Sequence, residues 1–184
     1  MPKFDGSSMP DSDGFTFVTS NADGTRAVAQ ALAAHLRAGD LVLLTGALGA
    51  GKTTFTQGLA TGLRVRGRVS SPTFIVAREH AALGAGPGLV HVDAYRLASL
   101  DELDALDLDT SLDDAVTVVE WGEDLAEVLA LNRLEIEIQR PTVTSSGIGD
   151  DDGIDTRVIT FRGIGPRWEQ TLDQTHQTIR AMRP

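Results

Sequence analysis

The sequence contains no cysteine, only one tyrosine and only two lysines, Lys3 and Lys52, so that arginine is its common cation. Without cysteine the chain forms no disulfide and offers no thiolate as a nucleophile or metal ligand. It has no apolar run of the roughly 20 residues that a membrane helix needs. Residues 1–14 also lack the apolar stretch of a secretory signal. We therefore expect no contact with a membrane and a cytoplasmic location.

The net charge of −10 argues against direct binding of nucleic acid. Such binding needs clustered lysine and arginine to contact phosphates. Arg64, Arg66 and Arg68 lie close together, and they are typical either of a solvated loop or of a contact to phosphate or to RNA held by a partner. If the chain serves a nucleic-acid process, we expect a partner protein to hold the nucleic acid.

The length of 184 residues suits one compact domain. We expect a disordered leader over residues 1–14, a single domain over 15–165, and a C-terminal helix or tail over 166–184. Apolar residues recur at helical spacing between Ser20 and Leu36, with Ser20 or Asn21 as the cap.

Continuous apolar runs predict three strands that are buried on both faces, at residues 41–45, 89–93 and 116–120. Helical patterns at 53–63 and 99–105 alternate with these strands. The segments 133–139 and 157–161 alternate like a half-exposed hairpin. Together these features predict an α/β fold: a P-loop NTPase-like domain of three layers. Its central sheet is mostly parallel, and the hairpin adds antiparallel strands at one edge.

The segment GALGAGKT, residues 46–53, fits the phosphate-binding pattern G-x-x-x-x-G-K-[ST] between a buried strand and a helix. Glycines allow the backbone N–H groups to converge on phosphate oxygens, and the helix adds the positive end of its dipole. A compact ammonium can lie between two phosphates where a planar guanidinium does not fit, which explains why Lys52 is a lysine. The expected nucleotide-binding residues here are Gly46, Ala47, Leu48, Gly49, Ala50, Gly51, Lys52, Thr53 and Thr54.

Two acids end buried strands, Asp93 in "LVHVD" and Glu120 in "VTVVE". A phosphate loop needs an acid at a nearby strand end to hold Mg²⁺, directly or through water. We expect Thr53, Asp93 and Glu120 to serve the metal. One of the two acids can instead orient the attacking water, and either one alone is equally typical of a solvated strand end.

Two further residues remain open between a nucleotide role and a structural one. Thr73, in "SSPTF", lies where loops that sense a γ-phosphate occur, but the same spacing suits a simple turn before a strand. Trp121 can stack on adenine, although a core or interface tryptophan is the more common case. The absence of an N-K-x-D motif favours ATP over GTP. The four histidines show no ligand spacing, and we assign them no role.

Four segments in order, "GALGAGKTTF", "SPTF", "HVDAYRL" and "VVEWG", resemble the TsaE (YjeE) family of small P-loop ATPases. The resemblance runs from about Thr19 to Gln139. It implies hydrolysis of ATP with Mg²⁺ in support of a TsaD–TsaB complex. That complex places a threonylcarbamoyl group on adenosine 37 of tRNA, so tRNA is reached only through the partners.

The resemblance also implies roles for single residues. Lys52, Thr73 and Glu120 match residues implicated in hydrolysis, whereas Thr53, Asp93 and Glu120 match the magnesium site. Trp121 matches a tryptophan near the nucleotide, and Thr25 a helix threonine near the base. The family usually has aspartate where this chain has Ala47. Backbone binding of phosphate tolerates this change, but a role of that carboxylate in partner contact or turnover does not carry over.

Two alternatives to the ATPase hypothesis remain open. One is a small-molecule kinase, but residues 141–154 contain no basic residue that would make an arginine-rich lid. The other is a module in which bound ATP orders the Thr73 loop and docks the chain on a partner, with hydrolysis incidental. The sequence does not separate this module from the ATPase, because both need the same loop and metal.

Overall fold

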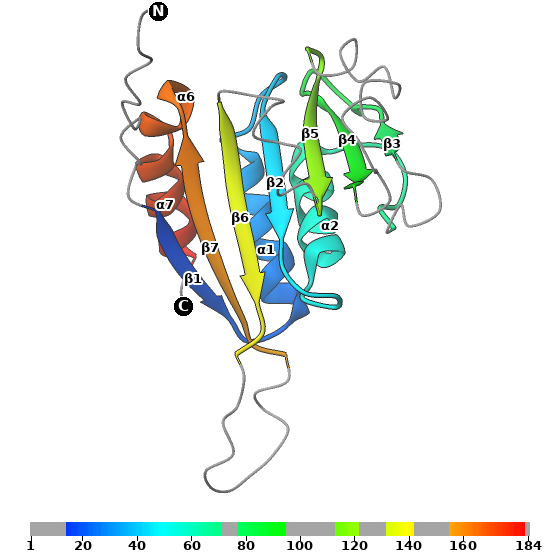
Figure 1. Cartoon of the computed structure of the whole chain (residues 1–184). Helices are drawn as coiled ribbons and strands as arrows, with labels where there is room; N and C mark the ends of the chain where they lie inside the picture. The colour runs from blue at the N-terminus through cyan, green and yellow to red at the C-terminus, as the bar shows by residue number, and fades with distance from the viewer. Residues whose placement is uncertain (1–13, 71–76, 95–112, 122–131, 142–154, 183–184) are drawn as a thin grey trace, which may run out of the picture.

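The computed structural model describes residues 14–70, 77–94, 113–121, 132–141 and 155–182 (Figure 1). In this part of the chain seven strands form one sheet in the order β1-β7-β6-β2-β5-β4-β3. The strands are β1 Phe15–Thr19, β2 Leu41–Thr45, β3 Ala77–His80, β4 Gly88–Asp93, β5 Ala115–Glu120, β6 Arg133–Gln139 and β7 Arg157–Ile164. The helices are α1 Ala22–Ala33, α2 Lys52–Leu63, α6 Pro166–Glu169 and α7 Leu172–Ala181.

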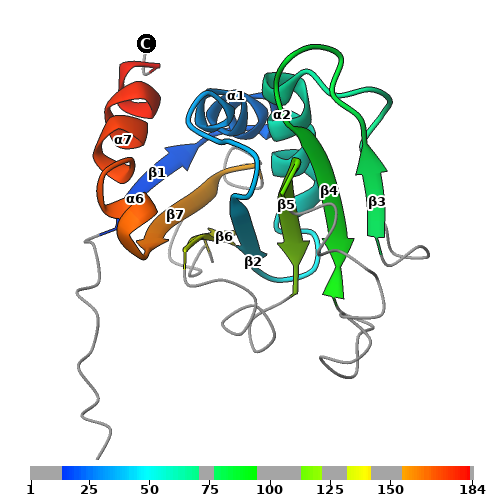
Figure 2. The same ribbon diagram turned by 90° about the horizontal axis from the view of Figure 1, so that it is seen from above.

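The centre of the sheet is parallel and its flanks are antiparallel. Strands β4, β5, β2 and β6 run parallel, whereas β3, β7 and β1 pair antiparallel with their neighbours. Every residue of β5 is buried, so both faces of the sheet are covered there. Figure 2 shows α1, α2 and α7 on one of these faces. The prediction of an α/β fold with a mostly parallel centre is confirmed.

The hairpin expected from residues 133–161 exists as β6 and β7, but its predicted place at the sheet edge is wrong. Strand β6 lies inside the sheet, parallel to β2, and β7 pairs on its other side with β1, a strand that no sequence pattern predicted. Buried and more exposed residues alternate along β6, as expected for a strand with one face in the core. Such alternation shows which side chains of β6 are buried, but it does not identify the strands that pair with β6.

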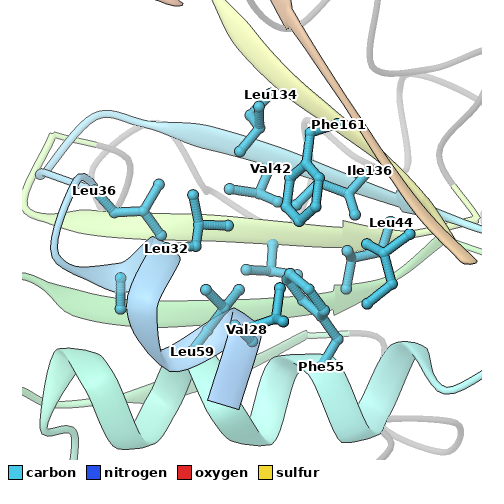
Figure 3. Close-up of a cluster of buried hydrophobic side chains, with 14 of the residues drawn as sticks. Val28, Leu32, Leu36, Val42, Leu44, Phe55, Leu59, Leu134, Ile136 and Phe161 are labelled. Atoms are coloured by element: carbon cyan, nitrogen blue, oxygen red, sulfur yellow. The ribbon is translucent and has the colours of Figure 1, made fainter. Parts of the chain in front are cut away.

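The main core lies between the sheet and α1 and α2 (Figure 3). Asn21 caps α1, since its side chain accepts a hydrogen bond from the N–H of Gly24 at 2.7 Å. Val28 and Leu32 of α1, together with Leu36 just after the end of that helix, lie in one cluster with Phe55 and Leu59 of α2 and with apolar side chains of β2 and β6 (Figure 3). Burial of these side chains fixes α2, and therefore its first residue Lys52, against the sheet.

Two glycines let α2 lie unusually close to α1. A Cβ atom at Gly58 would be 2.3 Å from the carbonyl oxygen of Arg26, and one at Gly62 would be 2.4 Å from the Cβ of Ala33. Glycine inside a helix costs about 1 kcal/mol relative to alanine. Glycine is nevertheless needed at positions 58 and 62, because a larger side chain would collide with α1.

The C-terminal segment packs on the body of the domain. The guanidinium of Arg167 donates to both carboxylate oxygens of Asp40, at 3.2 and 3.0 Å, and to the carbonyl of His35 at 2.7 Å. Trp168 and Ile179 are fully buried, and the imidazole of His176 stacks on Phe15 with ring centroids 4.4 Å apart. Residues 166–181 therefore form two packed helices, where the sequence predicted a single helix or tail.

Some expectations fall outside the described residues: the leader over 1–13, Thr73, the helix at 99–105, and the loop over 142–154. Within the described ranges, no helix has both the length and the apolar character to cross a membrane.

We predict that Gly58→Ala lowers the free energy of unfolding by about 1–3 kcal/mol, because the added methyl group meets backbone atoms of α1. Gly84→Ala is the matched control, since a Cβ there has open space and its change should stay within about 0.5 kcal/mol. Urea unfolding followed by circular dichroism measures both. Equal stability of the two variants would contradict the close packing of α1 and α2.

Candidate functional site

The candidate site lies at the carboxyl ends of three parallel strands. In the sheet register Leu44 of β2 is opposite Glu120 of β5, and Glu120 is opposite Asp93 of β4. The chain leaves β2 two residues after Leu44 and enters the loop at Gly46. The loop and both acids predicted from the sequence therefore meet at one edge of the sheet.

Residues 46–51 form the turn between β2 and α2, and its glycines adopt conformations that other residues avoid. Gly46 has φ +137°, and a Cβ atom there would be 2.3 Å from the carbonyl oxygen of Ile138, the residue next to the end of β6. Gly51 has φ +115° and is the N-cap of α2, with no side-chain cap. The first N–H groups of α2 are thus left without intrahelical or capping acceptors.

The tip of the loop is open to solvent and its base is packed. Ala47, Leu48 and Gly49 are exposed, with 90% of the Leu48 surface accessible, whereas Ala50 is buried. The backbone N–H of Ala50 donates to the carbonyl of Ala47 at 3.0 Å. The contact within the loop is made by backbone atoms, and it uses no side chain at position 47.

The ammonium of Lys52 lies over the loop. Its Nζ donates to the carbonyl of Gly46 at 2.7 Å and to that of Ala47 at 3.3 Å. It also lies 3.7 Å from the centre of the Trp121 ring. Lys52 is only 5% exposed, so its charge acts in a partly desolvated place where electrostatic interactions are strong.

Trp121 is held at this loop by its backbone. It has φ +64°, which is uncommon for a bulky residue, and its N–H donates to the carbonyl of Leu44 at 3.4 Å. The indole thereby contacts Lys52 instead of entering the core. Stacking of Trp121 on adenine stays a prediction.

Two carboxylates are buried beside the first turn of α2. The hydroxyl of Thr53 donates to Oε1 of Glu120 at 3.4 Å, and Asp93 faces Glu120 across the strand pair. Neither acid exposes more than 7% of its surface. Among the described residues no group of three or more His, Cys, Asp and Glu side chains could by itself hold a metal ion. A metal here would need additional oxygen ligands from a bound molecule.

Among the described residues, the side-chain hydrogen bonds of Thr25 reach neither Lys52 nor the two buried acids. The hydroxyl of Thr25 bonds to the hydroxyl of Thr19 at 2.9 Å and to the carbonyl of Asn21 at 3.2 Å, and it therefore stabilises the start of α1. Thr54 follows Thr53 on the first turn of α2 and is half-buried. Thr73 lies outside the described residues.

Two residues at the site were not expected from the sequence. Nε2 of His91 is 2.8 Å from Oε1 of Glu120, and Nε of Arg157 donates to the carbonyl of Ala50 at 2.7 Å. Burial, and then the positive charge of Arg140, lower the pKa of Arg157 from its usual range. A histidine inside the valine-rich run "LVHVD" was a signal that could have been used. Arg157 comes from β7, and no local pattern connects it with the loop.

Comparison with known proteins gives a consistent result. The family model "Threonylcarbamoyl adenosine biosynthesis protein TsaE" matches residues 19–146. A Streptomyces coelicolor protein named tRNA threonylcarbamoyladenosine biosynthesis protein TsaE is 55% identical over 144 residues, covering 78% of this chain and 93% of that protein. A Bacillus subtilis protein of the same name is 40% identical over 157 residues, covering 85% and 90%.

A solved structure agrees with these relatives. The crystal structure of Bacillus subtilis YdiB superposes with a TM-score of 0.68 at 34% sequence identity, over 92% of this chain and 98% of that one. The family match covers more than half of the chain, and it includes β2, the loop, α2, Asp93 and Glu120. The chain belongs to the TsaE family of threonylcarbamoyladenosine biosynthesis proteins.

Proposed function

We propose that this chain is a magnesium-dependent ATPase that supports a TsaD–TsaB complex in the threonylcarbamoylation of adenosine 37 of tRNA. The observation that carries the proposal is the joint position of Lys52, Thr53 and Glu120 at the end of β2. Lys52 and Thr53 open α2, and the hydroxyl of Thr53 contacts Glu120. A turn that served structure alone would not need a buried ammonium and two buried acids at one point.

The loop and Lys52 supply the binding of phosphates. Anions are stabilised at the N-terminus of a helix, where free N–H groups and the helix dipole act together. The carbonyls of Gly46 and Ala47 hold the ammonium above this helix end. A phosphate oxygen can replace these neutral acceptors with a charged one, and charge-assisted hydrogen bonds are the stronger kind.

The residues present fit Mg²⁺, provided that the nucleotide also supplies ligands. Mg²⁺ prefers oxygen and is usually held by one or two carboxylates together with substrate phosphates and water. Thr53, Glu120 and Asp93 offer oxygen atoms only, and no larger ligand cluster is found among the described residues. When bound, the metal would neutralise charge that develops on the phosphates.

Glu120 is our candidate for orienting the attacking water. It is buried, its Oε1 already accepts hydrogen bonds, and it is the last residue of β5, the strand beside β2. Lys52 would stabilise negative charge on the transferred phosphoryl group, and Trp121 excludes solvent from one side of that ammonium. Thr73 remains a candidate sensor of the γ-phosphate from its place in the sequence.

We predict that Lys52→Ala weakens binding of ATP at least about tenfold, because a charge-assisted contact is worth about 1.5–3 kcal/mol. Glu120→Gln should instead keep ATP affinity and lower kcat by about 10²–10⁴-fold. Calorimetric titration measures affinity, and phosphate release measures turnover. Unchanged turnover in both variants would contradict the site, and a working tRNA modification pathway with Glu120→Gln would favour the ATP-gated binding module.

We further predict that ATP hydrolysis by the chain alone is slow and accelerates in the presence of TsaD, TsaB and tRNA. The acidic chain should not respond to tRNA alone, since its charge of −10 repels phosphate. The measurement compares phosphate release with each component omitted in turn, and Glu120→Gln is the background control. A rate that is indifferent to the two proteins would contradict the partnership and leave the ATPase assignment intact.

A further inference from the structure

We infer that His91 is a positioning residue for the ATPase reaction, which acts by holding Oε1 of Glu120 through its Nε2–H. The inference rests on the proposed ATPase function and deepens it. His91 lies in β4 two residues before Asp93, so both side chains lie on one face of the strand. In the register Val118 is opposite His91 and Glu120 is opposite Asp93, which places Glu120 diagonally across from the imidazole.

The hydrogen bond itself is short and buried. Nε2 of His91 is 2.8 Å from Oε1 of Glu120, and the side chains expose 0% and 4% of their surfaces. A carboxylate can only accept hydrogen bonds, so the imidazole is the donor in this contact. Nδ1 is also buried and has no hydrogen-bond partner among the described residues. A proton on Nδ1 would be left without an acceptor, whereas a proton on Nε2 is accepted by Glu120.

Packing alone does not explain a histidine at this position. The neighbouring residues Val90 and Val92 are apolar and almost fully buried, and a valine or leucine at position 91 would leave no buried nitrogen unpaired. An unpaired buried polar group costs about 1–3 kcal/mol. The unpaired Nδ1 of His91 therefore has a cost, and the hydrogen bond that His91 makes in return is the one to Glu120, the candidate water-orienting acid.

The consequence for Glu120 is a fixed orientation. Asp93 is its direct cross-strand neighbour, and like charges in such a position repel. Both hydrogen bonds to Glu120 within the described residues, from His91 and from Thr53, end on Oε1. In this part of the chain the carboxylate is thereby held by one oxygen, and we expect the other oxygen, Oε2, to serve water or metal.

Three substitutions at His91 test this role. The side-chain nitrogen of glutamine reaches about as far as Nε2, whereas that of asparagine reaches only about as far as Nδ1. We expect His91→Leu and His91→Asn to lower kcat about 10–100-fold, as is typical when a supporting hydrogen bond to a metal or catalytic group is removed. His91→Gln should recover most of the wild-type kcat. All three should keep the Kd for ATP within about threefold, because no phosphate-binding group changes.

A purely structural histidine predicts a different pattern. Loss of packing would lower the unfolding midpoint in proportion to the activity loss, and Asn and Gln would behave alike. We expect urea midpoints of the Asn and Gln variants to be similar while their kcat values differ. Adding His91→Asn to Glu120→Gln should lower kcat by less than about twofold further, because both changes act on one interaction.

The two proposals can fail separately. Absence of ATP hydrolysis by the wild-type chain, alone and with partners, would overturn the proposed function. An active wild type with equal kcat for His91→Leu, His91→Asn and His91→Gln would overturn the positioning role alone, whether that common value is normal or reduced. Full additivity of His91→Asn and Glu120→Gln would overturn it as well.

Discussion

The parallel pairing of β2, β5 and β4 places Leu44, Glu120 and Asp93 in one row, and the candidate site depends on that row. Parallel strands end at the same edge of a sheet, and the loop after β2 leaves from that edge. A slip of the register by one residue would turn Glu120 to the other face of the sheet. The hydrogen bonds from Thr53 and His91 would then be lost together.

The turn over residues 46–51 is held in place by contacts from β6 and from the helices. On one side, the glycine at position 46 lies against the carbonyl of Ile138 at the end of β6. On the other, α2 is pressed onto α1 through Gly58, which sets the position of Lys52 at the start of the helix. Arg157 adds a third contact by binding the carbonyl of Ala50. The turn is therefore fixed by the packing of its neighbours as well as by its own glycines.

Local patterns in the sequence were sufficient for much of this arrangement. The glycine spacing predicted the loop, and the apolar runs that end in Asp93 and Glu120 predicted the two acids at strand ends, since both signals lie within about ten residues. The place of β6 beside β2, the edge strand β1 and the contact of Arg157 with Ala50 could not be predicted. They join segments that are distant along the chain, and alternation of burial gives no information about the identity of the neighbouring strand.

The charges at the site explain why its cations differ in kind. Glu120 and Asp93 are direct cross-strand neighbours, and two like charges in such a position repel each other. Arg157 makes a fixed contact with a backbone carbonyl, which suits a rigid guanidinium with directed N–H groups. Lys52 donates to two neutral carbonyls, and under the proposed function it exchanges them for a phosphate, for which a point charge on a flexible stem is suited. Of the two lysines in the sequence, Lys52 is the one that the structure describes, and under the proposed function it is the cation that changes its partner.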